Sequence, residues 1–138
     1  MKNILFVCTG NTCRSPMAEA IFNHFAPEGY SAFSAGIYAS DGKAISDNSI
    51  AALAEIGISA SHTSVKINEQ LMSKYDYIVG ITSEHAKILT GLYPEFAKKI
   101  YSFPREVSDP YGMDLDAYRK CRDLIYDGIC DIIKEICK

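Results

Sequence analysis

The feature of the sequence that most constrains its fold is a short apolar run near the first residue. Residues 4–7 read Ile-Leu-Phe-Val, follow two polar residues and lead into Cys8. A strand with one wet face alternates apolar and polar side chains, whereas an unbroken apolar run is typical of a strand covered on both faces in a parallel sheet. We therefore expect a central strand here, with helices packed on both sides of its sheet.

The rest of the chain alternates strand-like and helix-like segments. Further strands are predicted at residues 30–35, 77–81 and 100–103. Helices are predicted after the expected N-caps Ser15, Ser46 and Ser83, over residues 68–74 and from about residue 114 onward. Short connections between alternating strands and helices favour a parallel sheet. The sequence thus predicts an α/β fold in three layers, a four-stranded parallel sheet flanked by helices, as one domain over residues 1–138.

Composition and charge exclude several classes of partner. The 138 residues are 48% hydrophobic and 22% charged, with a net charge of -3. Proteins that bind nucleic acids usually carry a basic face, so we expect no nucleic-acid partner. No apolar run approaches the roughly 20 residues that span a bilayer, and we expect no membrane association.

The cysteines and histidines predict neither disulfides nor a metal site. The five cysteines are an odd number, and no signal-peptide pattern precedes the first predicted strand, so we expect a reduced, cytoplasmic protein. The cysteines lack paired C-x-x-C spacing and the histidines are scattered, so we expect no metal and no cofactor. Structural roles are expected for His24, His85, Cys121, Cys130 and Cys137.

The loop after the first predicted strand has the composition of a phosphate-binding loop. Residues 8–15 read Cys-Thr-Gly-Asn-Thr-Cys-Arg-Ser, and ligands of parallel sheets bind beyond the carboxyl ends of the strands. Such a loop can curl its backbone N–H groups inward into an anion-binding nest, which the following helix N-terminus reinforces. Arg14 can hold two phosphate oxygens with its planar guanidinium. We expect inorganic phosphate or another oxyanion to contact Thr9, Gly10, Asn11, Thr12, Cys13, Arg14 and Ser15.

The same positive field favours a nucleophilic thiolate at Cys8. Cysteines in such settings can have a pKa of roughly 3.5–7.5 in place of about 8.5, so we expect Cys8 to be ionised at neutral pH, with Ser15 as a hydrogen-bond donor to the sulfur. Gly10 and Asn11 are the loop residues that most readily accept a left-handed backbone. A nucleotide-binding P-loop is excluded, because no Gly-Lys-Ser/Thr sequence ends this loop.

Residues 7–16, Val-Cys-Thr-Gly-Asn-Thr-Cys-Arg-Ser-Pro, resemble the signature of the low-molecular-weight protein tyrosine phosphatases, and residues 109–111, Asp-Pro-Tyr, resemble their distant acid motif. The resemblance extends over nearly the whole chain. It implies that Cys8 attacks phosphorus while Asp109 protonates the leaving group, and that water activated by Asp109 then hydrolyses the phosphocysteine. Arg14 and the loop amides would stabilise the transferring phosphate, and phosphorylated proteins would be the substrates.

The resemblance also implies roles for residues around the loop. Ser34 and His62 are similar to family positions that support the loop asparagine, here Asn11. Cys13 matches the family's second loop cysteine, which can trap Cys8 as a reversible disulfide under oxidation.

The choice of substrate stays open at this level. Tyrosine-directed members commonly carry a bulky aliphatic residue where this chain has Thr12, and the branch that removes phosphate from arginine resembles this chain in having threonine there. Tyr111 is followed by Gly112, so one wall of an aromatic clamp is absent from the acid motif, and Tyr38 is a candidate for another wall. Phosphotyrosine and phosphoarginine both fit.

Two other functions are alternatives. A thiol-dependent arsenate reductase resembles this fold and loop, but it needs additional redox cysteines beyond the loop, and no such pair occurs in mid-chain here. A non-catalytic phosphoprotein-binding module would use the same loop without turnover. The presence of both Cys8 and Asp109 argues against that second alternative.

Overall fold

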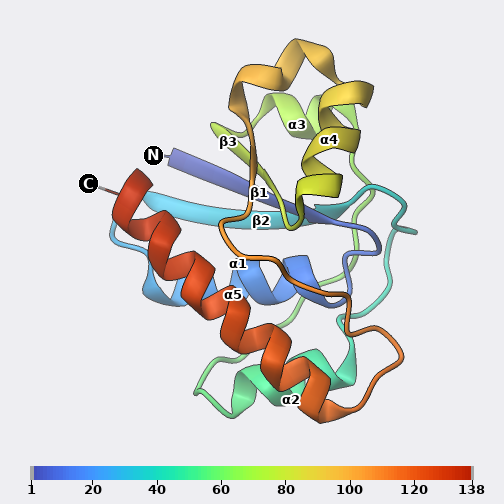
Figure 1. Cartoon of the computed structure of the whole chain (residues 1–138), viewed down its shortest axis with the longest axis vertical. Coiled ribbons are helices and arrows are strands. Elements are labelled where there is room, and N and C mark those ends of the chain that lie inside the picture. Colours follow the sequence, from blue (N-terminus) through green and yellow to red (C-terminus); the bar gives the residue numbers. More distant parts are fainter. Residues whose placement is uncertain (1, 138) are drawn as a thin grey trace.

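The computed structural model describes residues 2–137 and contains a parallel sheet between two layers of helices (Figure 1). The strands are β1 (Lys2–Cys8), β2 (Tyr30–Gly36), β3 (Tyr77–Gly80) and β4 (Ile100–Ser102). The helices are α1 (Arg14–Phe25), α2 (Asp47–Ala54), α3 (Glu69–Ser73), α4 (Ser83–Leu92) and α5 (Leu115–Ile136), with a 3-10 helix η1 (Pro94–Lys99). Helices α1, α2 and α5 lie on one side of the sheet and α3 and α4 on the other. The three-layer α/β prediction is confirmed.

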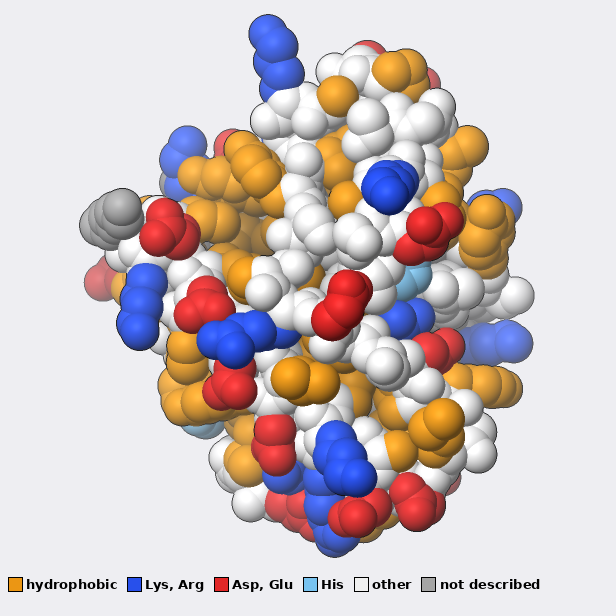
Figure 2. Space-filling view, in the orientation of Figure 1, with side chains coloured by type: hydrophobic (Ala, Val, Ile, Leu, Met, Phe, Trp, Pro, Cys, Tyr) orange, Lys and Arg blue, Asp and Glu red, His pale blue; other side chains and the backbone are white. Residues whose placement is uncertain are grey.

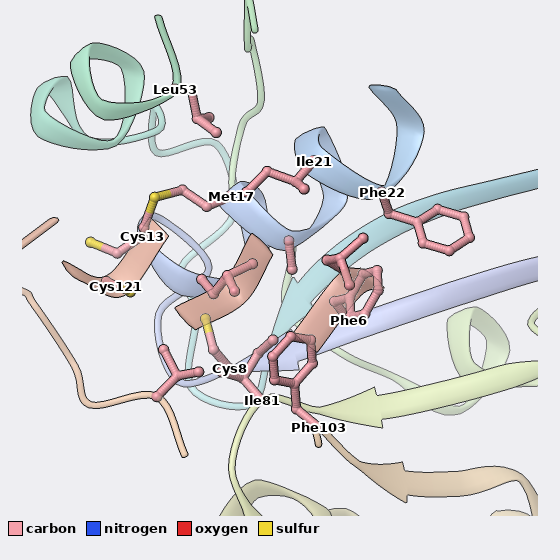
Figure 3. Close-up of a cluster of buried hydrophobic side chains, with 14 of the residues drawn as sticks. Phe6, Cys8, Cys13, Met17, Ile21, Phe22, Leu53, Ile81, Phe103 and Cys121 are labelled. Carbon is pink, nitrogen blue, oxygen red and sulfur yellow. The ribbon is translucent and has the colours of Figure 1, made fainter. Parts of the chain in front are cut away.

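Strand β1 is central and buried on both faces, as its apolar run predicts. The sheet order is β2-β1-β3-β4, and every pairing is parallel. Ile4 and Phe6 pack with α1 and α5, whereas Leu5 and Val7 pack with residues of α3 and α4. Phe6 also contacts Phe103 through an edge-on ring pair, near Cys8 and Ile81 (Figure 3).

Register brings the carboxyl ends of three strands to one edge of the sheet. Cys8 pairs with Gly36 of β2, and Val7 pairs with Gly80 of β3. The loop that follows β1 lies across this edge. A Cβ atom on Gly36 would stand 2.6 Å from the carbonyl oxygen of Thr9, so only glycine lets the loop rest directly on the end of β2.

A second glycine lets α5 approach the sheet near this edge. A Cβ atom on Gly128 would stand 2.1 Å from the ring of Phe103. Phe103 follows β4 and opens the irregular segment 103–114, which contains the acid motif.

Among the helices of residues 2–137, none combines the length and the apolar character that a membrane-spanning helix requires.

The helices differ from the sequence prediction in three places. Helix α1 begins at Arg14, so Ser15 lies inside the helix and its hydroxyl is used by the loop instead of capping. Thr82, not Ser83, caps α4, because its hydroxyl accepts a hydrogen bond from the backbone N–H of His85. Helix η1 was not predicted. The caps at Ser46, Asn68 and Asp114 each accept a backbone N–H bond.

Candidate active site

The curled loop is organised around Asn11, which is fully buried and adopts a φ of 58°. Asparagine is one of the few side chains that tolerate this left-handed conformation, because its short polar group bonds locally. Of the two residues that the sequence offered for the left-handed position, Asn11 adopts it and Gly10 does not, because Gly10 has a negative φ. The reversal at Asn11 turns its own backbone N–H toward the sulfur of Cys8, at 3.3 Å.

The side-chain amide of Asn11 ties the loop to strand β2, helix α1 and the irregular segment 62–65. Its Nδ2 donates to the hydroxyl of Ser15 at 2.8 Å and to that of Ser34 at 3.0 Å. Its Oδ1 accepts from the backbone N–H of Val65 at 2.9 Å and lies 2.8 Å from Nε2 of His62. The structure therefore places Ser34 and His62 against Asn11, where the family resemblance put them.

Glu19 on α1 extends this network, and sequence reasoning missed it. Its carboxylate accepts from the hydroxyl of Ser34 at 2.8 Å and lies 3.5 Å from Nδ1 of His62. Burial raises the pKa of Glu19 to about 6 and lowers the pKa of His62. The available signal was helical spacing, since Glu19 lies four residues after Ser15 and so on the same face of α1.

Cys8 lies at the base of the loop, buried at the end of β1. Its sulfur is 2.8 Å from the hydroxyl of Ser15. Burial raises the pKa of the Cys8 thiol, whereas hydrogen bonds from Ser15 and the Asn11 amide and the charge of Arg14 lower it. Burial is the largest of these effects, so the expectation of a strongly acidic thiol is wrong for this structure. Ser15, the Asn11 amide and Arg14 oppose the effect of burial and so favour the thiolate of Cys8.

Ser15 is placed to change its hydrogen bonds with the charge of the sulfur. Its oxygen accepts from Asn11, so its single proton can go either to the sulfur of Cys8 or to the carbonyl of Ala35, 3.4 Å away. A neutral thiol can donate to Ser15 while Ser15 donates to Ala35. A thiolate accepts the Ser15 proton instead, which stabilises the charged form.

Arg14 is buried and held by one group of its own loop and by groups of the acid segment. Its Nη1 donates to the carbonyl of Val107 at 3.1 Å, and its Nη2 donates to the hydroxyl of Thr9 at 3.5 Å. The same Nη2 lies 3.7 Å from a carboxylate oxygen of Asp109, whose side chain is 51% exposed. The Tyr111 backbone N–H donates to Asp109 at 3.1 Å and fixes its orientation.

A cavity of about 460 Å³ opens above these groups. Its floor is formed by loop residues 8–14, and Asp109, Tyr38 and Tyr111 line its mouth. Both tyrosines are largely exposed, Tyr111 to 74%. The face seen in Figure 2 mixes acidic and basic side chains, and its described residues form no continuous basic band.

Cys13 is held away from solvent by contacts of its own. It is buried, lies 3.3 Å from the hydroxyl of Tyr118 and donates to the hydroxyl of Ser46 at 3.6 Å. Burial and the Cys13 contact raise the pKa of Tyr118 to about 12. Cys8 and Cys13 are both free thiols in this structure, and the disulfide between them stays a prediction.

A buried thiol under a curled loop, an arginine beside it and a carboxylate at the rim together define the class of cysteine-dependent phosphatases. The family model described as low molecular weight phosphotyrosine protein phosphatase matches residues 3–138, and the chain belongs to this family. It is therefore an enzyme, a protein phosphatase.

The relatives include arginine phosphatases. The chain is 34% identical to a protein-arginine-phosphatase of Bacillus subtilis (strain 168), over 99% of this chain and 97% of that protein. The YwlE arginine phosphatase from Geobacillus stearothermophilus has a TM-score of 0.95 at 30% identity, covering 99% of this chain and 94% of the other. A YwlE mutant with a phosphorylated active-site serine has a TM-score of 0.91 at 33% identity, covering 99% and 96%.

Another enzyme class also matches. An arsenate reductase of Staphylococcus aureus is 33% identical over 90% of this chain and 90% of that protein.

Proposed function

We propose that the chain hydrolyses phosphorylated side chains of proteins, with Cys8 as nucleophile, Arg14 as phosphate clamp and Asp109 as general acid. The observation that carries this proposal is the convergence of three groups on one cavity: the Cys8 sulfur at its floor, and Arg14 and Asp109 3.7 Å apart at its side. Cys8 and Arg14 come from the loop after β1, whereas Asp109 comes from a segment about a hundred residues further along the chain. A phosphate oxygen that bonds Nη2 of Arg14 replaces Asp109 there, which leaves the carboxyl group free to act on the leaving atom.

The reaction proceeds in two steps, transfer of the phosphoryl group to Cys8 and hydrolysis of the phosphocysteine. In the first, the Cys8 thiolate forms a bond to phosphorus as the bond to the leaving oxygen or nitrogen breaks, and Asp109 gives its proton to that leaving atom. In the second, water attacks phosphorus, Asp109 takes a proton from it, and the sulfur leaves as a thiolate that Ser15 stabilises. The YwlE mutant phosphorylated on its active-site serine supports a phosphorylated enzyme at the corresponding step.

Phosphoarginine is the substrate that we favour within this class. Thr12 is half-buried and lines the cavity, so its hydroxyl can bond a guanidinium nitrogen, which an aliphatic side chain cannot do. The arginine phosphatases among the relatives support the same choice. Tyr38 and Tyr111 offer aromatic surfaces on which a planar guanidinium can stack.

A side-by-side assay tests this function. Purified protein is given phosphotyrosine and phosphoarginine proteins at equal concentration, with Cys8→Ser as the control that keeps the loop. We expect turnover of phosphoarginine to exceed that of phosphotyrosine, and Cys8→Ser to lose about 1,000-fold or more in turnover. Tight binding without release of phosphate from either substrate would instead indicate a phosphoprotein-binding module.

Arsenate reduction fits the described cysteines less well. Beyond the loop, Cys121 and Cys130 lie in α5 and Cys137 follows its last residue, and among the described cysteines only Cys8 and Cys13 line the cavity. Release of arsenite in the presence of thioredoxin would favour the arsenate reductase over the phosphatase.

A further inference from the structure

His85, which the sequence predicts to be structural, lies behind the phosphate-binding loop. It belongs to the first turn of α4, and its residue is only 5% exposed. Gly80, the last residue of β3, makes this position possible. A Cβ atom there would stand 2.6 Å from the backbone nitrogen of Ala86, so glycine lets the start of α4 press against the end of the strand.

Both ring nitrogens of His85 contact threonine hydroxyls. Nδ1 lies 3.0 Å from the hydroxyl of Thr82, the N-cap of α4, which fixes the plane of the ring. Nε2 lies 2.9 Å from the hydroxyl of Thr9 in the loop. That same hydroxyl accepts the hydrogen bond from Nη2 of Arg14. A chain of side-chain contacts thus runs from the N-terminus of α4 to the arginine.

We propose that His85 is a positioning residue for phosphate binding, which acts through the Thr9 hydroxyl to hold the guanidinium of Arg14 in place. The inference rests on the proposed function of the loop. Arg14 can only donate, so the Thr9 oxygen must present a lone pair to it, and a hydroxyl that turned freely would present one only part of the time. The contact to His85 removes that freedom.

The imidazole is suited to this role because it is neutral. Burial and the charge of Arg14 lower the pKa of His85 to about 4, against an opposing effect of Asp109. A neutral ring adds no positive charge beside Arg14. The guanidinium is then fixed on two sides, by Thr9 at Nη2 and by the Val107 carbonyl at Nη1. Such preorganisation lowers the ordering cost when phosphate binds.

The test compares three variants with a control on the same helix. His85→Leu removes the ring nitrogens, Thr9→Val removes the hydroxyl while keeping its shape, and the third variant combines both. Leu89→Ala is the control. Leu89 is a fully buried residue of α4 that packs with Leu5 and Val7 and does not line the phosphate-binding loop. Each protein is assayed with an aryl phosphate, and the Ki of inorganic phosphate is measured together with Tm.

We expect His85→Leu and Thr9→Val each to raise the Ki of phosphate about three- to tenfold and to lower kcat/KM by a similar factor. The double variant should be no worse than either single variant, because both interrupt the same contact. His85→Gln, which restores a polar atom near the Nε2 position, should recover part of the loss. Leu89→Ala should lower Tm without changing Ki.

Three results would overturn the proposal: an unchanged Ki in Thr9→Val, a lowered Tm with normal Ki in His85→Leu, or multiplying effects in the double variant. Thr9 is exposed, so Thr9→Val carries the test even if His85→Leu does not fold. Failure of the unmodified protein to bind phosphate or hydrolyse the aryl phosphate would instead refute the proposed function.

Discussion

The phosphate-binding loop and the acid segment face the same cavity but are held in opposite ways. The loop is fixed from behind by buried polar groups, with all four hydrogen-bonding positions of the Asn11 amide in use. Segment 103–114 has no regular structure and is anchored mainly by the buried side chains of Phe103, Val107 and Pro110. The phosphate-binding loop is thus held by buried hydrogen bonds, whereas the segment that carries Asp109 is held mainly by apolar packing and leaves the carboxylate half exposed.

The largest expected effect comes from Asn11→Ala, which breaks the buried side of this comparison. It leaves the Val65 N–H without its partner and removes one buried hydrogen bond each from Ser15, Ser34 and His62, so we expect a loss of about 3 kcal/mol or more in the free energy of unfolding. We also expect kcat/KM to fall about 1,000-fold or more. Urea unfolding and an aryl phosphate assay measure the two losses.

Asn23→Ala is the matched control for that variant. Asn23 also makes two bonds through its side-chain amide, both to the backbone of Ala32, but at the exposed surface. Asn23→Ala should lower the free energy of unfolding by no more than about 1.5 kcal/mol and leave kcat/KM unchanged. Equal losses in the two variants would mean that burial of the Asn11 network has no special role.

The next effect comes from the acid segment. Asp109→Asn should lower kcat for a phosphoprotein about 100-fold or more, because the leaving atom loses its proton donor. An aryl phosphate with a strongly acidic phenol should lose less. The free energy of unfolding should change by no more than about 0.5 kcal/mol, since the side chain is half exposed. Equal losses for good and poor leaving groups would contradict the role of Asp109 as general acid.

A smaller effect is expected at Thr12, on the wall of the cavity. Thr12→Ile should lower turnover of phosphoarginine about tenfold, because a guanidinium nitrogen loses a polar partner, and leave aryl phosphate hydrolysis unchanged or improved. Steady-state assays on both substrates decide this. If both activities fall equally, Thr12 only supports the shape of the loop, and phosphotyrosine becomes the favoured substrate.

The smallest expected effect is a shift in the pKa of Cys8. Ser15→Ala removes a donor to the thiolate, so the pKa of Cys8 should rise further, and alkylation by iodoacetamide should move to higher pH. The pKa rises because the Ser15 hydroxyl stabilises the thiolate more than the neutral thiol, and the variant loses that stabilisation. An unchanged or lowered pKa in this variant would show that Ser15 does not stabilise the thiolate.

The parts of the site that were predicted from the sequence are those set by local rules. Strand β1 and the loop follow from adjacent residues, which also limit the left-handed position to Gly10 or Asn11, and the order of strands and helices predicts where the loop lies in the sheet. The contacts of His85 and Glu19 with the loop network were not predicted, because they depend on which side chains the packed helices bring beneath the loop. His85 is 76 residues away from Thr9 in the chain.

Sequence-based predictions were least successful where burial and tertiary contacts compete with local interactions. The loop donors predict an acidic thiol at Cys8, but burial outweighs them. Arg119 and Arg122, in the charged run at the start of α5, both pair with Glu55, at 2.7 Å each, and so connect α5 to the end of α2. Sequence patterns give the charges of these residues and not the helix they face.

The most direct measurement is rapid acid quenching of the protein during turnover, followed by mass spectrometry of the peptide that contains Cys8. The account predicts a phosphate group on the sulfur of Cys8 that forms before inorganic phosphate is released, and no such species in Cys8→Ala. Release of phosphate with Cys8 unmodified at every time, or phosphate found on another residue, would contradict it.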